Sequence, residues 1–332
     1  MRLLKKILAV ILVLCIIYIL GPKPQTPVYK TDLPIIPDDT TALIKYVAAK
    51  EALHKIKPDN EARIVWANDS AKNQTEYAIV YLHGYSASQE EGNPVHRNIA
   101  KQFGCNLYLS RLSQHGIDTT DALQNLTADN YWESAKEAYA IGKQLGKKVI
   151  LMGTSTGSSL ALQLAATYPD IAGLILMSPN IEINDPNAWI LNNHWGLQIA
   201  RLVVGSKYRD ITGRSAQYNQ YWNTHYRLES AVALEELLET AMTRNTFNKV
   251  TQPTLVLYYY KDEQHQDNVV RVSAMKKMFA ALATPSNNKR MIAVPDAGNH
   301  VIGSPIQSKD IETPQKETAL FLKQVMKLQP VQ

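Results

Sequence analysis

The residues of this sequence best suited to covalent chemistry lie in the pentapeptide Gly153-Thr154-Ser155-Thr156-Gly157. An apolar, strand-like run precedes it at residues 147–152, and a helical pattern follows at residues 158–168. A serine between two glycines on a strand–turn–helix junction has its hydroxyl exposed for attack. A phosphate-binding loop is the alternative, but it needs a lysine after its last glycine, and none follows Gly157. We therefore predict that Ser155 is a nucleophile.

A nucleophilic serine needs a general base and an acid that orients the base, and in this context the chain order is Ser, acid, His. His300 is the one histidine on a loop after the last predicted strand. Two aspartates follow the strand predicted at residues 254–259: Asp262 at the usual short distance, and Asp267 directly before the apolar pair Val269-Val270. The stretch from Asp267 to His300 matches the length of one helix and one strand more closely than the longer stretch from Asp262 does. We predict Asp267 as the acid, with Asp262 as the alternative.

An acyl-transfer site also needs donors for a developing oxyanion. One is expected from the backbone N–H of Thr156, directly after the nucleophile. The other is expected from the loop His83-Gly84-Tyr85-Ser86, which follows the predicted strand at residues 77–82. We assign the second donor to the N–H of Tyr85 and expect His83 to support the loop by hydrogen bonding. This set of residues implies no metal ion and no organic cofactor.

Short apolar runs alternate with amphipathic helical patterns along most of the chain. Because the runs are mostly continuous rather than alternating, they indicate strands buried on both faces of a parallel sheet. The strands are expected at residues 61–67, 77–82, 106–109, 148–152, 173–177, 254–259 and 290–294, and the main helices at residues 40–56, 93–103, 128–145, 158–168, 269–282 and 313–326. This alternation predicts an α/β fold with a mostly parallel, doubly wound sheet.

One long stretch, residues 178–253, interrupts this alternation without a strand pattern. We expect it to form a helical cap at about residues 181–250. Its aromatic side chains either fill the core of the cap or line an apolar pocket, and both roles can hold at once; we assign most of them to packing. They are Trp189, Trp195, Tyr208, Tyr218, Tyr221, Trp222 and Tyr226.

The N-terminus combines a basic head, which carries Arg2, Lys5 and Lys6, with an unbroken apolar run at residues 7–20. These are the parts of a secretory signal. A cleaved signal peptide and a lipoprotein are alternatives, but both need small residues at a processing site, and the end of the run and the positions before Cys15 lack them. We therefore predict an uncleaved signal anchor.

The expected domain organisation is an anchor at residues 1–21, a proline-rich stalk at 22–37 and a catalytic domain at 38–332. By the positive-inside rule, the basic head would stay in the cytoplasm and the catalytic domain would be exported on the far side of the membrane. The membrane is then a partner of the chain through its N-terminus.

Charge and cysteine usage exclude two other classes. The chain has a net charge of +5, but basic side chains in the first thirty residues account for this excess, and no basic stripe follows them. A nucleic-acid-binding function is therefore not indicated. Of the two cysteines, Cys15 lies in the apolar run and Cys105 in the body, so neither an internal disulfide nor a cysteine metal site is expected.

Taken together, His83-Gly84, the pentapeptide at 153–157, an aspartate after the next-to-last strand and Gly298-Asn299-His300 resemble the α/β-hydrolase superfamily. Within it, the chain is most similar to monoacylglycerol lipases, lysophospholipases and related serine esterases, over about residues 61–328. The resemblance implies hydrolysis of a small-molecule or lipid-like ester through an acyl-enzyme. These enzymes often carry Asp-x-x-Gly-His-Gly after the next strand, whereas here Arg111 stands near the usual position of the acid.

Other functions fit the same residues. Related enzymes with this set of groups cleave peptides or amides, or transfer acyl groups to other acceptors. A non-catalytic, membrane-tethered binding module is a further alternative, although a binding protein has no need of serine, acid and histidine in the order of a hydrolase.

Overall fold

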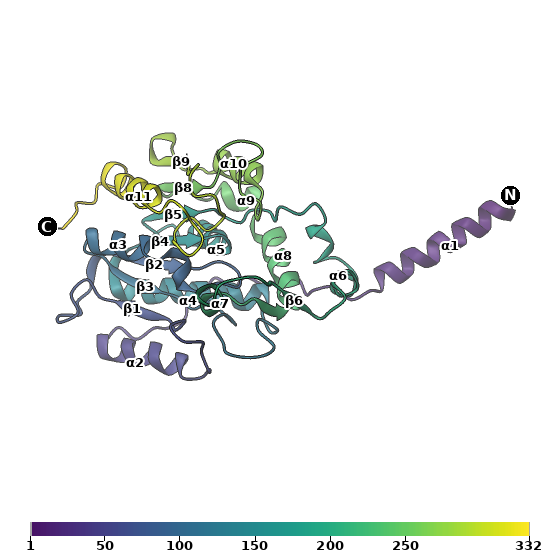
Figure 1. The fold of residues 1–332 in the computed structure, drawn as a ribbon, viewed down its shortest axis with the longest axis horizontal. Coiled ribbons are helices and arrows are strands. Elements are labelled where there is room, and N and C mark those ends of the chain that lie inside the picture. The colour runs from purple at the N-terminus through teal and green to yellow at the C-terminus, as the bar shows by residue number, and fades with distance from the viewer. Residues whose placement is uncertain (1, 332) are drawn as a thin grey trace.

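The computed structural model describes residues 2–331 and is organised around a seven-stranded sheet (Figure 1). The strand order is β1-β3-β2-β4-β5-β8-β9, and all neighbours are parallel except β1, which pairs antiparallel with β3. The strands are β1 (Arg63–Val65), β2 (Thr75–Leu82), β3 (Asn106–Leu109), β4 (Gly146–Thr154), β5 (Gly173–Met177), β8 (Thr254–Tyr258) and β9 (Lys289–Ala293). The predicted fold class and its seven strands are confirmed.

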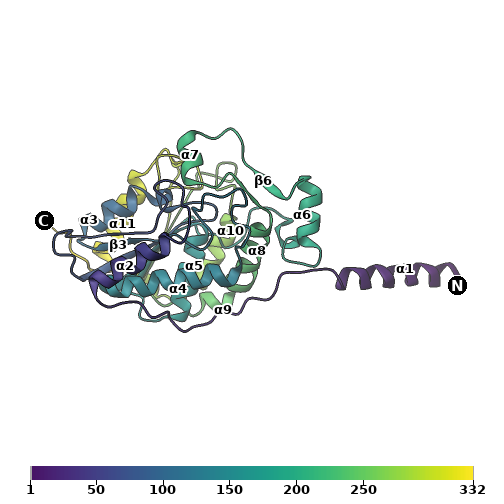
Figure 2. The same ribbon diagram turned by 90° about the horizontal axis from the view of Figure 1, so that it is seen from below.

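Helices cover both faces of this sheet (Figures 1 and 2). One face is covered by α3 and α11, and the other by α4, α5 and α10. The helices outside the cap are α1 (Arg2–Ile19), α2 (Thr40–Glu51), α3 (Val95–Gln102), α4 (Ala128–Leu145), α5 (Thr156–Thr167), α10 (Val272–Ala281) and α11 (Glu312–Gln324). Two short 3-10 helices, η1 (Gln89–Gly92) and η3 (Ser286–Asn288), complete the set.

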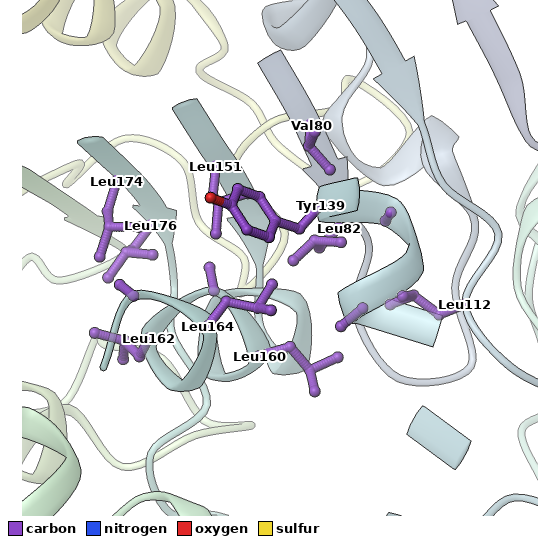
Figure 3. Close-up of a cluster of buried hydrophobic side chains, with 14 of the residues drawn as sticks. Val80, Leu82, Leu112, Tyr139, Leu151, Leu160, Leu162, Leu164, Leu174 and Leu176 are labelled. Atoms are coloured by element: carbon purple, nitrogen blue, oxygen red, sulfur yellow. The ribbon is translucent and has the colours of Figure 1, made fainter. Parts of the chain in front are cut away.

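Successive strand residues enter two separate cores. Val80 and Leu151 face α4 and α5, whereas their neighbours Ile79 and Ile150 face α3 and α11. Figure 3 shows the first of these cores, where side chains of the strands meet those of α4 and α5, among them Leu160. Each large aliphatic side chain buried in this way contributes about 1.5–3 kcal/mol of transfer free energy. The strand ends are therefore a rigid platform for the loops that follow them.

Residues 178–253 connect β5 to β8, and we name this segment the cap; its role as a separate unit at about residues 181–250 stays a prediction. Its elements are η2 (Ala188–Ile190), α6 (Gly196–Val204), β6 (Tyr208–Asp210), α7 (Ala216–Tyr221), β7 (His225–Arg227), α8 (Glu229–Ala241) and α9 (Arg244–Phe247). The antiparallel pair β6 and β7 was not expected from the sequence. Both strands have three residues, rich in polar and charged side chains, so they lack the apolar run by which the other strands are recognised.

Helix α1 extends away from the body of the molecule in both views (Figures 1 and 2), with its apolar side chains exposed. It has 18 residues and includes Arg2, Lys5 and Lys6, so that the purely apolar part of the helix is limited to residues 7–19. A membrane-crossing helix needs about 20 predominantly apolar residues. Within residues 2–331, no helix is both long and apolar enough to cross a membrane. This finding contradicts the expected localisation, in which an N-terminal signal anchor holds an exported catalytic domain at the membrane, and it gives no support to the membrane as a partner.

Residues 22–37, which we name the N-terminal strap, lie against the body of the molecule. Trp132 of α4 donates its indole N–H to the carbonyl of Lys30 at 2.8 Å, and the ammonium of Lys136 donates to the carbonyl of Asp32, also at 2.8 Å. Tyr29 reaches α8, where its hydroxyl lies 2.6 Å from that of Thr240. The strap thus provides hydrogen-bond partners for two buried side chains of α4. The division of the chain at residues 21 and 37 stays a prediction.

Candidate active site

Ser155 occupies the sharp turn between β4 and α5. Its backbone has φ 53° and ψ −121°, a strained conformation for a residue with a side chain. The two glycines permit the turn, because a Cβ on Gly153 would lie 2.6 Å from the carbonyl carbon of Gly157, and a Cβ on Gly157 would lie 1.9 Å from the carbonyl oxygen of Leu82. The serine N–H donates to the carbonyl of Met177 at the end of β5. The turn is therefore fixed by the two neighbouring strands.

Asp267 and His300 form a buried pair at the same edge of the sheet. The Oδ2 atom of Asp267 lies 2.6 Å from Nδ1 of His300. The second carboxylate oxygen, Oδ1, accepts hydrogen bonds from the N–H groups of Val269 and Val270. Both oxygens are thereby engaged, and the carboxylate is locked in one orientation toward the imidazole.

Asp262 lies elsewhere, in an exposed turn between Tyr260 and Gln266. Its Oδ1 accepts from the backbone N–H of Gln264 and His265, and from Nδ1 of His265. The structure thus brings Asp267, and not Asp262, to His300. The residues between the two aspartates form a small turn of their own, which lengthens the connection after β8.

The environment of His300 favours its charged form. Burial alone lowers the pKa of the imidazole, but the charge and hydrogen bond of Asp267, together with the charge of Glu91, raise it to a value above the ordinary one. Among the described residues, its buried Nε2 atom has no hydrogen-bond partner. Ser178, directly after β5, donates its hydroxyl to the carbonyl of His300 at 2.7 Å. The end of β5 therefore contacts both Ser155, through Met177, and His300.

Two neutral histidines support the loop after β2. Nε2 of His83 accepts from the N–H of Leu112, and Nε2 of His115 accepts from the N–H of Ser86, both at 3.0 Å. Because a backbone N–H can only donate, both rings carry their proton on Nδ1. Burial lowers the pKa of both imidazoles, to about 4 for His83. His83 thus supports the loop by hydrogen bonding, in keeping with its expected role.

The two backbone N–H groups proposed as oxyanion donors are free to donate to a ligand. Within residues 2–331, no protein acceptor is hydrogen-bonded to the N–H of Tyr85 or of Thr156. Thr156 is the first residue of α5, where the helix dipole also favours negative charge. The Tyr85 side chain points away to the cap, with its hydroxyl 2.6 Å from that of Ser230 on α8.

Glu91 is a buried carboxylate beside this site, and no motif in the sequence singled it out. Its Oε2 accepts from the N–H of Gly84 at 2.6 Å. A Cβ on Gly84 would lie 2.9 Å from both carboxylate oxygens and 3.0 Å from Cβ of Ser155, so Gly84 lies between the two side chains. Burial raises the pKa of Glu91 to about 7, although the bond from Gly84 and the charge of His300 oppose this shift. Glu91 thus fixes the loop and acts electrostatically on His300.

Arg111 stands near a position where related enzymes often have an acid, and the structure explains this difference. Its guanidinium forms a two-point ion pair with Glu51 of α2, with Nε–Oε2 at 2.7 Å and Nη2–Oε1 at 3.1 Å. A third nitrogen, Nη1, donates to the carbonyl of His115. Arg111 therefore holds the turn that carries His115, at a position where related sequences often have an acid.

Aromatic side chains of the cap cover the loops around Ser155. Trp222 packs against Ala87 of the loop after β2 and against Val301, the neighbour of His300, and it stacks on Tyr218. Other cap aromatics lie away from this cluster, such as Trp189, whose side chain is exposed. The cap therefore contributes both packing and an apolar surface next to the site. Within residues 2–331, no group of three or more His, Cys, Asp or Glu side chains is arranged to hold a metal ion.

Comparison with known families decides the class of the protein. The family model described as serine aminopeptidase, S33 matches residues 111–300, which is more than half of the chain. The chain belongs to this family. It is a serine hydrolase with the α/β-hydrolase fold and has esterase- or lipase-type activity, as the relatives below also indicate.

One curated relative is the thermostable monoacylglycerol lipase of Bacillus sp. (strain H-257). It is 24% identical over 189 residues, which cover 56% of this chain and 70% of the relative. This match agrees with the resemblance to monoacylglycerol lipases found in the sequence.

Solved structures show the same fold at low identity. A structure from work on LipS and LipT, two metagenome-derived lipolytic enzymes, has a TM-score of 0.64 at 15% identity and covers 81% of this chain and 99% of its own. The monoacylglycerol lipase of Paleococcus ferrophilus has a TM-score of 0.57 at 14% identity, with 79% and 98% covered. Est1E from Butyrivibrio proteoclasticus, solved with ferulic acid, has a TM-score of 0.54 at 14% identity, with 80% and 95% covered.

Proposed function

We propose that this enzyme hydrolyses carboxylic esters of lipid-like molecules, with Ser155 as nucleophile, His300 as general base and Asp267 as the acid that orients the base. The observation that carries the proposal is the buried Asp267–His300 pair, whose Nε2 is unpartnered among the described residues, at the sheet edge that carries the strained serine. A hydrolase with this set of groups needs no cofactor for ester cleavage.

In the first half of the reaction, Nε2 of His300 takes the proton from the hydroxyl of Ser155 as its oxygen attacks the ester carbonyl. The carboxylate of Asp267 holds the imidazole in the tautomer that accepts at Nε2, and it stabilises the imidazolium that forms. The oxyanion accepts hydrogen bonds from the N–H groups of Tyr85 and Thr156. In measured cases, one such donor is worth about 2.7–4 kcal/mol of barrier.

The first half ends when His300 gives its proton to the departing alkoxide, and the acyl group stays on Ser155. The second half regenerates the enzyme. A water molecule then gives a proton to the imidazole and attacks the acyl carbonyl, and the carboxylic acid leaves as the serine regains its proton. The charge of Glu91 stabilises the imidazolium in both halves because its carboxylate acts on the same ring.

Two observations support an apolar acyl group. The cluster of Trp222, Tyr218 and Val301 presents apolar surface beside the loops that carry the site. The relatives of this chain include two proteins named as monoacylglycerol lipases. An amide substrate is the second candidate, since the family is described by its serine aminopeptidases. Acyl transfer and a purely binding role are the remaining alternatives.

A panel of p-nitrophenyl esters with increasing acyl length, a monoacylglycerol and a p-nitroanilide tests the proposal. We expect turnover of the esters with a preference for medium or long chains, slow turnover of the anilide, and labelling of Ser155 by a fluorophosphonate. Ser155→Ala is the control and should show neither turnover nor labelling. Absence of labelling in the wild type would contradict the proposed nucleophile, and faster turnover of the anilide would favour the amidase.

A further inference from the structure

A groove of about 600 Å³ lies between α8, α9 and α10, which are neighbours in both views (Figures 1 and 2). It is separate from Ser155, and none of its lining residues belongs to the proposed active site. Its walls are largely apolar, with acidic and basic side chains among them. The apolar side chains that matter here are Leu238, Met242, Phe247 and Met278.

One lining residue, Glu235 of α8, carries a polar atom without a partner. Its side chain belongs to a residue that is only 4% exposed. Among the described residues, its buried Oε2 atom has no hydrogen-bond partner, and Glu235 takes part in no ion pair. A buried carboxylate without a partner is unfavourable by several kcal/mol. It either stays charged and loses its solvation energy, or it takes up a proton at a pH where it would otherwise be ionised. A ligand that donates to Oε2 would remove this penalty.

The charges around Glu235 are arranged for a cation. Burial raises its pKa, and together with the charges of Glu239, Glu182 and Asp185 it brings the value to about 7. Two basic residues, Arg244 on α9 and Lys277 on α10, also line the groove, but neither is paired with Glu235 among the described residues.

Arg271 is the other basic residue near these carboxylates, and it is already engaged by Glu182. The potential at Glu235 is therefore set by carboxylates, and an incoming positive charge would be attracted to it.

We propose that this groove binds an amphiphilic monocation, with a primary ammonium on Glu235 and an aliphatic or aromatic body against the apolar wall formed by α8, α9 and α10. A primary ammonium supplies the donors that Oε2 lacks. The apolar part gains from burial at about 25 cal/mol per Å². A metal ion is a poor alternative, since no suitable group of three ligands occurs within residues 2–331.

The groove is connected to the active site by the backbone. The backbone carbonyl of Glu182 accepts a hydrogen bond from the N–H of Arg271, and Ile183 forms an isolated antiparallel bridge with Val270. Val270 in turn donates to the carboxylate of Asp267. The binding site therefore lies next to the loop that carries the proposed acid, yet its occupant does not meet the nucleophile.

Isothermal titration calorimetry of the full chain with n-octylammonium tests this site, with 1-octanol and octanoate as probes of the same length. We expect one octylammonium per chain, and weaker binding of both other probes. Glu235→Gln keeps the size and shape of the side chain. It should weaken the binding of octylammonium by about tenfold or more, because the charged partner of the ammonium is lost. Glu236→Gln removes a carboxylate at the next position of α8, outside the lining of the groove; it is the matched control and should change the affinity much less.

The pH dependence separates this site from simple apolar binding. Octylammonium stays protonated over the range used, while Glu235 becomes ionised as the pH rises through about 7. The affinity should therefore rise by about tenfold from pH 6 to pH 8 in the wild type and stay constant in Glu235→Gln. Equal affinity of the wild type and Glu235→Gln, or no binding to a wild type whose folding is verified by circular dichroism, would overturn the proposal.

Discussion

The carboxyl edge of the sheet and the cap that covers it are held together by different interactions. At the sheet edge, Asp267 and Ser155 are fixed by hydrogen bonds to the backbone. In the cap, the contacts near the site are aromatic, as in the stack of Trp222 on Tyr218, and its strands have only three residues each. Directional bonds fix the reacting groups to fractions of an ångström, whereas apolar contacts tolerate changes of shape. The comparison indicates that the edge determines the chemistry and the cap determines which ester enters.

The largest effect expected at the sheet edge is that of Ser155→Ala. Loss of the nucleophile should reduce kcat by about 10⁶, as in serine proteases. The side chain contributes little packing, so the free energy of unfolding should change by less than about 1 kcal/mol. Ester turnover and urea unfolding measured on the same preparation check both statements. Activity above a trace with normal folding would mean that another residue attacks.

Asp267→Asn should have the next largest effect. An amide in place of the carboxylate loses the preference for the correct imidazole tautomer, and kcat should fall by about 10⁴. Asp262→Asn is the matched control, since its carboxylate is bonded to His265 in an exposed turn. It should keep kcat within about threefold of the wild type. Kinetics of both variants on one ester at one pH decide between the two aspartates, and a severe defect in Asp262→Asn would contradict the assignment.

The pH profile tests the electrostatics of the sheet edge. His300 must be neutral to accept a proton, and its pKa is raised above the ordinary value, so kcat/KM should fall as the pH drops through a value above about 6.5. Glu91→Gln removes a charge that favours the imidazolium, and the acid limb should therefore move to lower pH. Glu90→Gln, one residue away and not among the groups that shift His300, should leave the limb in place. An unchanged profile in Glu91→Gln would mean that Glu91 acts only by holding Gly84.

The smallest effect concerns one of the hydrogen bonds between the two regions, that of Tyr85 with Ser230. Ser230 donates its single proton to the carbonyl of Arg227, so the hydroxyl of Tyr85 must donate to Ser230. Tyr85→Phe should lower the free energy of unfolding by about 1 kcal/mol and change turnover of a short ester only slightly. Long-chain esters should respond more, because the cap then moves more freely over the site. Equal changes for short and long esters would argue against a role of the cap in substrate choice.

The core of the fold could be predicted from the sequence because its signal is local. Strands buried on both faces are continuous apolar runs, and the runs at 106–109 and 173–177 coincide with β3 and β5. The need for glycines around Ser155 could also be predicted from the sequence, since their spacing follows from contacts at a single turn. The spacing argument placed Asp267 ahead of Asp262, and the structure brings Asp267 to His300; its role as the acid stays a prediction.

The parts that could not be predicted depend on contacts between distant segments. Glu91 is recognisable only once the loop after β2 folds back on Gly84, and nothing distinguishes it in sequence from Glu90. The pairing of Arg111 with Glu51 joins α2 to a turn 60 residues away. The prediction of an N-terminal anchor was wrong for a different reason. A basic head and an apolar run suggest a membrane-crossing helix, but the apolar run is too short to form one.

The N-terminal strap has a practical consequence for any shortened form of the enzyme. A chain that began at residue 38 would leave the indole of Trp132 and the buried ammonium of Lys136 without the carbonyls that now receive their protons. Of its two partners, Lys136 would then keep only Glu133, whose Oε1 lies 3.0 Å from its Nζ. A chain that began at residue 23 would keep both acceptors while discarding α1. The useful boundary for recombinant expression therefore lies before Lys30 and Asp32, whose carbonyls accept the hydrogen bonds from α4, and so well before the first helix of the body begins at Thr40.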